Sequence, residues 1–394
     1  MKPRILLLAS ELPPGPGGIG THAHQMALEL VRHGWELQVL APQEYADDAA
    51  VARWTEAQPY AIERVRRLPG APVQAGFRLA RATALWRRQR PALVVASGER
   101  MVWVAAALAR SVRAPLVTIG HAMEFNVPRR WNRAVNRSAY NASTGVVCVS
   151  EYTAAQMRRL GIAPRLAAVI PNGADDARFH RVDPAEGVAF RAAHQLGSGP
   201  LLLTVGSVHE RKGQHMVVRA LPQILARFPD AHYVSCGLPQ KAEAFTALAR
   251  ELGVAERVHF LGAVPHAELL RALAAADLFV MASQHTANGD FEGYGIAAVE
   301  AALCGRAAVV TDGSGLVEAI EPDVTGLVAR TASAESVAEQ VIRALSDPPR
   351  LAAMGAAAEA RARREQTWSR RGAQYDAFMR HSAFNRTESA EGAI

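Results

Sequence analysis

Cysteines and long apolar runs are both scarce in this sequence. Its three cysteines, Cys148, Cys236 and Cys304, lie far apart along the chain. Three scattered thiols exclude the disulfide framework of a small secreted domain and are typical of a reducing compartment. The longest uninterrupted apolar run, Met101–Ala109, falls well short of the roughly 20 residues that a membrane-spanning helix needs. We therefore expect a cytoplasmic protein whose cysteines are buried and unreactive.

Lysine is nearly absent as well, because Lys2, Lys212 and Lys241 are the only lysines among 44 basic residues. Residues 1–180 contain 23 Lys+Arg against 13 Asp+Glu, which leaves 21 against 24 in the remainder (44 − 23 and 37 − 13). A basic first half beside a nearly neutral second half indicates that the two halves meet different partners. No nucleic-acid-binding motif accompanies the charge, so we do not expect nucleic acid as a partner.

What the sequence does contain is a regular alternation of short apolar runs and longer helical patterns. Continuous apolar strands separated by helices are typical of a parallel sheet that is covered on both faces. The opening stretch, MKPRILLLAS, lacks the length and the cleavage site of a secretory signal, so we expect it to form the first buried strand. The expected strands are Arg4–Ala9, Leu37–Ala41, Leu93–Ser97, Pro115–Ile119, Gly145–Val149 and Ala168–Pro171, then Leu201–Val205, His232–Cys236, Val258–Phe260, Leu278–Met281, Ala307–Thr311 and Leu327–Ala329.

The polar stretch Arg178–Gly199 interrupts this alternation, and we interpret it as a linker. A chain of 394 residues is long enough for about two domains. We therefore predict the α/β class, with two doubly wound domains that face each other across a cleft. Ligands of such sheets bind beyond the carboxyl ends of the strands, so the loops that follow strands are the candidate sites.

The first such loop, PPGPGGIGTHAHQ, places Gly17 and Gly18 before an expected helix at Thr21–His33. Glycines allow a ligand to approach the backbone closely, and amides at a helix start attract anions. The glycine order departs from the dinucleotide fingerprint, which argues against a dinucleotide-dependent oxidoreductase. His22 and His24, two positions apart, point in divergent directions on a helix and cannot share a metal.

The second loop, VGSVHERKGQH, contains Arg211 and one of the rare lysines, Lys212, just before a helix start. Arginine offers a bidentate fork and lysine a point charge, a combination that suits a diphosphate. The third stretch, DFEGYGIAAVEAALCG, contains Glu292 and Glu300 on either side of a helix start. Eight helical residues span about 12 Å, so the two carboxylates could hold opposite ends of an elongated ligand.

These motifs, in this order, resemble glycosyltransferase family 4. The matching stretches are GGIGTHAHQMALELVRHGWELQVL, PNGADDARF, VGSVHERKG and FEGYGIAAVEAALCGRAAVVTDGSGLVEAI. The resemblance covers nearly the whole chain and implies the GT-B fold, with two Rossmann-like domains. It also implies a retaining transferase that moves a sugar from a nucleotide-sugar donor to an acceptor hydroxyl, with no cofactor and no metal.

The resemblance assigns roles to individual residues. Glu292 would hold the donor sugar, Glu300 the ribose, and Arg211 with Lys212 the departing diphosphate. His121, in VTIGHAMEF, would line the donor sugar as a catalytic residue. Further donor contacts would come from Gly17, Gly18, Asn172, Gly293, Tyr294 and Gly295. A nucleotide-sugar epimerase of the same fold is the alternative, and a non-catalytic module is disfavoured by the intact glutamate pair.

Three parts follow from the resemblance and the interpreted linker. Residues 1–180 would bind the acceptor, residues 181–365 the nucleotide-sugar, and residues 366–394 would form a helix that returns to the first domain, plus a tail. The acceptor would be a glycan, a lipid or a small molecule. Basic amphipathic helices lie on anionic membranes, so we expect peripheral membrane contact through Arg78, Arg81, Arg87, Arg88 and Arg90, and through the similar segment 127–137.

Overall fold

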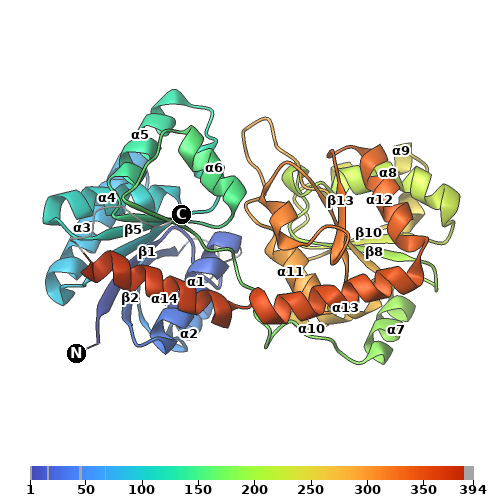
Figure 1. The fold of residues 1–394 in the computed structure, drawn as a ribbon, viewed down its shortest axis with the longest axis horizontal. Coiled ribbons are helices and arrows are strands. Elements are labelled where there is room, and N and C mark those ends of the chain that lie inside the picture. The colour runs from blue at the N-terminus through green and yellow to red at the C-terminus, as the bar shows by residue number, and fades with distance from the viewer. Residues whose placement is uncertain (1, 16, 44–46, 67, 386–394) are drawn as a thin grey trace. The chain divides into compact units, whose positions relative to one another are not determined.

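The computed structural model describes residues 2–15, 17–43, 47–66 and 68–385, and Figure 1 shows its ribbon. The chain divides into two compact units. Unit 1 comprises Met1–Asn172 with Trp368–Ile394, and unit 2 comprises Gly173–Thr367. Of the predicted C-terminal part, residues 386–394 lie outside the described residues.

Unit 1 is built on a parallel sheet with the strand order β3-β2-β1-β4-β5-β6-β7. Its strands are β1 (Arg4–Ala9), β2 (Glu36–Gln43), β3 (Ala61–Arg66), β4 (Leu93–Ser97), β5 (Leu116–Gly120), β6 (Gly145–Cys148) and β7 (Leu166–Val169). The helices are α1 (Gly18–Arg32), α2 (Asp48–Glu56), α3 (Ala71–Gln89), α4 (Glu99–Val112), α5 (Arg130–Asn141), α6 (Glu151–Arg159) and α14 (Trp368–Phe384), with the short 3₁₀ helix η1 (Met123–Phe125).

Unit 2 has a second parallel sheet with the order β10-β9-β8-β11-β12-β13. Its strands are β8 (Leu201–Val205), β9 (His232–Cys236), β10 (Val258–Gly262), β11 (Leu278–Met281), β12 (Ala308–Thr311) and β13 (Gly326–Ala329). The helices are α7 (Pro184–Ala193), α8 (Gln214–Arg227), α9 (Ala242–Glu251), α10 (His266–Ala275), α11 (Ile296–Leu303), α12 (Ala334–Leu345) and α13 (Pro348–Glu365). The 3₁₀ helices are η2 (Glu210–Lys212), η3 (Ala255–Arg257) and η4 (Gly315–Ala319).

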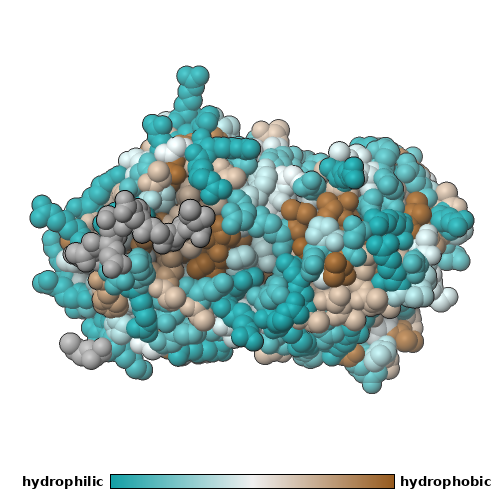
Figure 2. Space-filling view, in the orientation of Figure 1, coloured by the Kyte–Doolittle hydropathy of each residue, from teal (hydrophilic) through white to brown (hydrophobic). Residues whose placement is uncertain are grey.

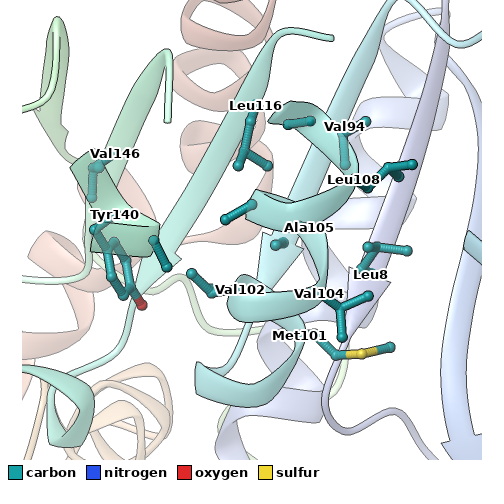
Figure 3. Close-up of a cluster of buried hydrophobic side chains, with 14 of the residues drawn as sticks. Leu8, Val94, Met101, Val102, Val104, Ala105, Leu108, Leu116, Tyr140 and Val146 are labelled. Atoms are coloured by element: carbon teal, nitrogen blue, oxygen red, sulfur yellow. The ribbon is translucent and has the colours of Figure 1, made fainter. Parts of the chain in front are cut away.

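The core explains why the strands are apolar along their whole length. Helices cover both faces of a doubly wound sheet, so side chains on both faces of a central strand leave water. In unit 1, helix α4 packs Met101, Ala105 and Leu108 against Leu8 and its neighbours on the sheet (Figure 3). The α/β expectation for both halves is therefore confirmed.

Two expectations about individual segments were wrong. The stretch that we interpreted as a linker contains α7, which starts at Pro184 behind an Asp183 cap and packs on α10. Its buried Phe190 holds it in unit 2. The segment looked like a linker because it contains Pro184 and Gly187 and buries only Phe190 among its large apolar side chains. Strand β3, with the sequence AIERVR, was missed because it lies at the sheet edge and only Val65 is fully buried.

Helix α14 belongs to unit 1 although it is the last element of the chain. It packs on α1, where the Tyr375 hydroxyl lies 2.8 Å from His22 Nε2 and Trp35 donates to Asp376 over 2.7 Å. Helices α1 and α14 thus pack together in unit 1 although they are far apart in the sequence.

Each sheet reverses its strand order at one point. In unit 1 the reversal lies between β1 and β4, and in unit 2 between β8 and β11. Ligands of doubly wound sheets bind in the crevice at such a reversal. The loops that follow β8 and β11 carry Arg211, Lys212 and Glu292, so the fold places these three residues at the reversal of unit 2.

The surface that Figure 2 displays is mostly hydrophilic, and apolar residues form separate patches on it. Among the described residues, no helix combines the length and the apolar character that crossing a bilayer requires.

Candidate active site

Arg211, Lys212 and Glu292 form one ionic cluster in unit 2. Both Lys212 Nζ, at 2.8 Å, and Arg211 Nη1, at 2.5 Å, contact the same oxygen of Glu292, Oε2. The Glu292 side chain is 10% exposed, whereas the Arg211 side chain is 26% exposed. The carboxylate of the cluster is therefore buried, and its cationic side is open to solvent. Two cations and one carboxylate leave one net positive charge available to an anion.

Opposing effects set the protonation of this cluster. Burial favours the neutral form of Glu292, but the charges of Lys212 and Arg211 and an amide hydrogen bond from Gly295 outweigh it and hold its pKa below the ordinary value. Burial also lowers the pKa of Lys212, against the attraction of Glu292. Because the carboxylate and the ammonium group stabilise each other, we treat both as ionised at neutral pH.

The loop after β8 positions the two cations through close backbone contacts. Gly213 ends η2 with φ of 74°, and a Cβ there would lie 1.7 Å from the Ala282 carbonyl oxygen. Only glycine tolerates both this backbone conformation and this approach. The Lys212 stem lies along Gly206, whose own Cβ would be 3.5 Å from Lys212 Cε, and Gln284 N–H donates to the Arg211 carbonyl over 3.0 Å.

Glu300 lies further along α11 and has a different environment. Among the described residues, its carboxylate has no hydrogen bond or ion-pair partner. Burial raises the pKa of Glu300 to about 7, partly opposed by Arg178 and Lys212. Lys212 thus acts electrostatically on both Glu292 and Glu300, and Glu300 is a half-ionised acceptor near neutral pH.

The raised pKa of Glu300 predicts a pH-dependent effect of Glu300→Gln. The folded chain holds this proton above the ordinary carboxyl pKa of 4.5 and releases it near 7, so the contribution of Glu300 to stability is lost as pH rises through that window. After allowance for partial exposure, the loss is about 1–2 kcal/mol. We therefore expect the unfolding temperature of Glu300→Gln, relative to that of wild type, to rise by about 4 °C between pH 5 and pH 8. An equal difference at both pH values would contradict the assignment.

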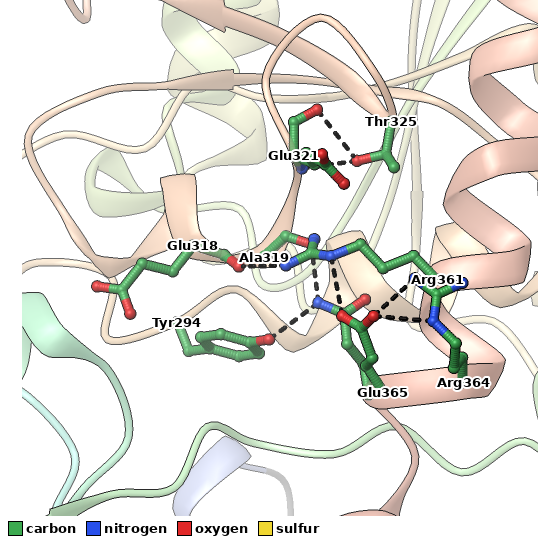
Figure 4. A network of polar contacts seen from close by, with 9 residues as sticks. Tyr294, Glu318, Ala319, Glu321, Thr325, Arg361, Arg364 and Glu365 are labelled. Carbon is green, nitrogen blue, oxygen red and sulfur yellow. Dashed lines mark hydrogen bonds and ion pairs between the residues drawn. The ribbon is translucent and has the colours of Figure 1, made fainter.

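The turn before α11 presents backbone rather than side chains. Gly295 has φ of 89° and precedes the first residue of α11, where the helix start leaves free amides. The Tyr294 side chain is directed elsewhere, because its hydroxyl accepts a hydrogen bond from Gln366 over 3.0 Å (Figure 4). Gln366 also donates to the Ala319 carbonyl. Tyr294 therefore anchors the turn, and any contact of Gly293, Tyr294 or Gly295 with a ligand runs through the main chain.

In unit 1, His121 follows β5 and is enclosed by polar partners. Its Nε2 lies 2.9 Å from the Ser97 hydroxyl at the end of β4, and its ring meets His22 edge-on at 4.8 Å. Burial lowers the pKa of His121 to about 4 and lowers that of His22, which also feels His121. His121 is therefore neutral at pH 7 and can exchange hydrogen bonds with hydroxyl groups without adding charge.

Glu124 fixes the turn that carries His121. Its carboxylate accepts hydrogen bonds from the N–H groups of His121, at 2.6 Å, and Ala122, at 3.1 Å, and from the Tyr140 hydroxyl at 3.0 Å. Ala122 has φ of 147°, a conformation that costs energy for any residue with a Cβ and persists only when its surroundings impose it. Sequence reasoning missed Glu124 and Ser97, because only the folded chain brings them to His121.

The remaining glycine-loop residues lie at the start of α1. Gly17 has φ of 142°, and a Cβ there would clash with the Glu11 carboxylate, whereas a Cβ on Gly18 would meet no atom within 4 Å. No acidic residue occupies the first turn of α1. His22 turns towards Tyr375, and His24 Nδ1 lies 2.6 Å from the Tyr60 hydroxyl, so the two histidines have separate partners. Asn172, the last residue of the first segment of unit 1, is buried.

The basic residues of α3 do not all reach the surface. Arg81, Arg87, Arg88 and Arg90 are exposed, but Arg78 is only 4% exposed. The expectation that Arg78 contacts a membrane surface was therefore wrong. The helical phase turns position 78 to the inside with Leu85 and Ala82, and a row of arginines in the sequence conceals that phase.

Each of the two units matches a family of glycosyltransferases. Residues 16–178 match the family described as Glycosyltransferase Family 4, and residues 189–361 match the family described as Glycosyl transferases group 1. The chain is 30% identical to a GDP-mannose-dependent alpha-(1-6)-phosphatidylinositol monomannoside mannosyltransferase of Mycolicibacterium smegmatis, over 94% of this chain and 96% of that one. Its counterpart in Mycobacterium tuberculosis H37Rv is also 30% identical, over 96% and 98%.

Solved structures share the fold over nearly the whole chain. The Anabaena protein HepE, solved with UDP and glucose, has a TM-score of 0.80 and 22% identity, covering 95% of this chain and 98% of that one. Sucrose-phosphate synthase from Thermosynechococcus elongatus has a TM-score of 0.82 and 21% identity, covering 96% and 99%. The predicted GT-B fold of two Rossmann-like domains is thereby confirmed. The chain belongs to glycosyltransferase family 4 and transfers a sugar from a nucleotide-sugar donor to an acceptor.

Proposed function

We propose that this enzyme transfers mannose from GDP-mannose to a hydroxyl of an anionic glycolipid related to phosphatidylinositol mannosides, with retention of the anomeric configuration. The observation that carries the proposal is the buried cluster of Arg211, Lys212 and Glu292 at the strand reversal of unit 2. The choice of donor and acceptor rests on the mycobacterial relatives, which match over nearly their full length.

The cluster suits departure of a nucleoside diphosphate. As the glycosidic bond breaks, negative charge grows on the diphosphate, and preorganised cations in a site of low dielectric stabilise it strongly. Arg211 and Lys212 provide that charge, and the amides of Gly293 to Gly295 at the start of α11 add to it. Glu292, already held by both cations, offers its remaining oxygen to hydroxyls of the sugar. Glu300 accepts hydrogen bonds from the ribose.

Unit 1 would supply the remaining groups. Neutral His121, fixed by Ser97 and Glu124, is proposed to hydrogen bond to the donor sugar, and Gly17, Gly18 and Asn172 to contact the donor through their backbone or amide groups. Because protein cations neutralise the leaving group in this scheme, transfer is expected to continue in excess EDTA.

A donor screen tests the proposal. Binding raises apparent stability by mass action, so thermal unfolding should shift upward most with GDP-mannose and GDP, and less with UDP- and ADP-sugars. Transfer from GDP-mannose to a phosphatidylinositol mannoside should then give a product whose anomeric configuration, read by NMR, equals that of the donor. A larger shift with a UDP- or ADP-sugar would overturn the choice of GDP-mannose, and an inverted product would overturn retention.

We also propose that unit 1 binds anionic membrane surfaces through α5 and the exposed arginines of α3. Helix α5 exposes Arg130, Arg133 and Arg137 together with Trp131, which is 56% exposed, and it contains no acidic residue. Apolar residues occur only as separate patches on the face displayed in Figure 2, so membrane contact has to combine them with cations.

Reversal of three charges on α5 should abolish this contact. Each basic residue near an anionic surface is worth about 1 kcal/mol, so replacing Arg130, Arg133 and Arg137 by glutamate should weaken binding to anionic vesicles about 100-fold or more. Vesicle flotation at low salt measures this. The matched control replaces Arg219, Arg227 and Arg250, exposed arginines of unit 2, and should float like wild type. Equal flotation of both triple variants would refute the α5 surface.

A further inference from the structure

A large cavity lies in unit 1 between α3 and α4, and none of its lining residues belongs to the ionic cluster of unit 2. Its volume is about 500 Å³, within the range of small-molecule sites. The walls are mostly apolar: Ala75 and Leu79 come from α3, and Trp103, Val104 and Ala107 come from α4. Water finds few hydrogen-bond partners on such walls, so its displacement by an apolar group is favourable.

The cavity lies towards the carboxyl ends of the strands of unit 1. Helix α3 begins after β3 and α4 begins after β4, so the first turns of both helices lie at the carboxyl ends of the strands. The lining residues belong to the amino-terminal halves of both helices, at positions 71–79 and 100–107, and to the segment 68–70 just before α3. His121 follows β5 at the same edge.

One cavity wall is connected to the turn that carries His121. Trp103 Nε1 donates to Asn136 Oδ1 over 2.6 Å, and Asn136 Nδ2 donates to the Glu124 carbonyl over 2.7 Å. On its other side the Trp103 ring contacts exposed Trp131 of α5, with 5.9 Å between centroids. Trp103 therefore lies between basic helix α5, which we propose for membrane contact, and the residues that hold His121.

The charged residues that line the cavity are both basic. Arg78 lines it although it is buried, and Arg100 lines it from an exposed position in the first turn of α4. No acidic residue is among the described residues that line it. An apolar chamber with two arginines complements an amphiphile that carries a negative charge beside its apolar chain.

We propose that this cavity receives one acyl chain of an anionic phospholipid acceptor, with the lipid phosphate at Arg100. This inference rests on the proposed function, because it identifies how unit 1 selects a lipid acceptor. The acyl chain lies against Leu79 and Trp103, and the headgroup remains at the sheet edge beside the His121 turn.

Calorimetric binding of dioctanoyl phosphatidylinositol below its critical micelle concentration tests the proposal without a transfer reaction. Ala107→Trp fills the cavity from an exposed position of α4 and should weaken binding about tenfold or more. Ala84→Trp adds the same side chain at an exposed position of α3 outside the cavity and should bind like wild type. Ala75→Phe, on the opposite wall, should reproduce the loss if Ala107→Trp unfolds.

Two further ligands separate the contributions of chain and charge. Glycerophosphoinositol, which lacks the chains, should bind at least about tenfold more weakly than the lipid. Arg100→Gln should weaken phosphatidylinositol binding severalfold and leave the binding of dioctanoylglycerol, which has the chains but no phosphate, unchanged. Unaltered lipid binding by both Ala107→Trp and Ala75→Phe, or headgroup binding as tight as that of the lipid, would overturn the cavity assignment. Chain-dependent binding without mannose transfer would instead reject the proposed function and support the cavity.

Discussion

Replacement of Lys212 with methionine is expected to lower kcat about 10²–10³-fold, the usual effect of removing one preorganised group that stabilises charge in the transition state. Methionine keeps most of the apolar stem that lies along Gly206, so the change removes the charge and little packing. Initial rates with saturating donor measure the effect, and thermal unfolding shows whether the variant remains folded.

The sequence offers a matched control for this experiment. Lys241 is also in unit 2, but its side chain is 48% exposed and only a distant contact of 3.9 Å joins it to Glu210. Lys241→Met removes the same charge from the chain and should retain wild-type turnover. If Lys212→Met and Lys241→Met behave alike, Lys212 does not act on the leaving group.

Glu292→Gln is expected to lower kcat/KM for sugar transfer about 10²–10³-fold while strengthening the binding of GDP. The carboxylate neutralises part of the charge of Arg211 and Lys212 in the free enzyme. Without it the two cations face solvent with a greater positive potential, so a diphosphate without a sugar should bind about tenfold more tightly. We expect transfer to fail nevertheless, because the group proposed to hold the sugar has lost its charge.

Opposite changes in two measurements make this prediction specific. GDP affinity comes from calorimetry and kcat/KM from initial rates, both at the same salt concentration because screening weakens the electrostatic part. Glu339→Gln, at an exposed position of α12, is the control and should change neither quantity. Weaker GDP binding by Glu292→Gln would mean that the carboxylate organises the cations for the diphosphate instead of neutralising them.

Much of the fold could be read from the sequence because burial imposes a simple pattern. Strands β1, β4, β8, β9 and β11 begin and end at the predicted residues, since both of their faces are buried and the apolar runs mark them directly. Edge strand β3 and surface helix α7 did not show this pattern. Strand β3 keeps polar residues because only Val65 is fully buried, and α7 buries a single large side chain, Phe190, between a proline and exposed alanines.

The candidate site, too, was predictable from the sequence only in part. The loops carrying Arg211, Lys212 and Glu292 were identifiable, because each follows a strand and combines glycines with charges at a helix start. Their mutual contact was not, since Arg211 and Glu292 are 81 positions apart and meet only because β8 and β11 are neighbours in the sheet. The resemblance assigns the sugar to Glu292 and the diphosphate to Arg211 and Lys212, and the structure places these three side chains in one ionic cluster.

By itself, then, the sequence determined the α/β class, the family resemblance and the chemical types of the donor-site residues, because local pattern and motif order carry that information. Tertiary structure alone decided which carboxylate is paired, which is half-protonated, that Arg78 faces inwards, and that Glu124 and Ser97 hold His121. Those properties depend on burial and on distances between residues far apart in the chain, and no local pattern encodes either.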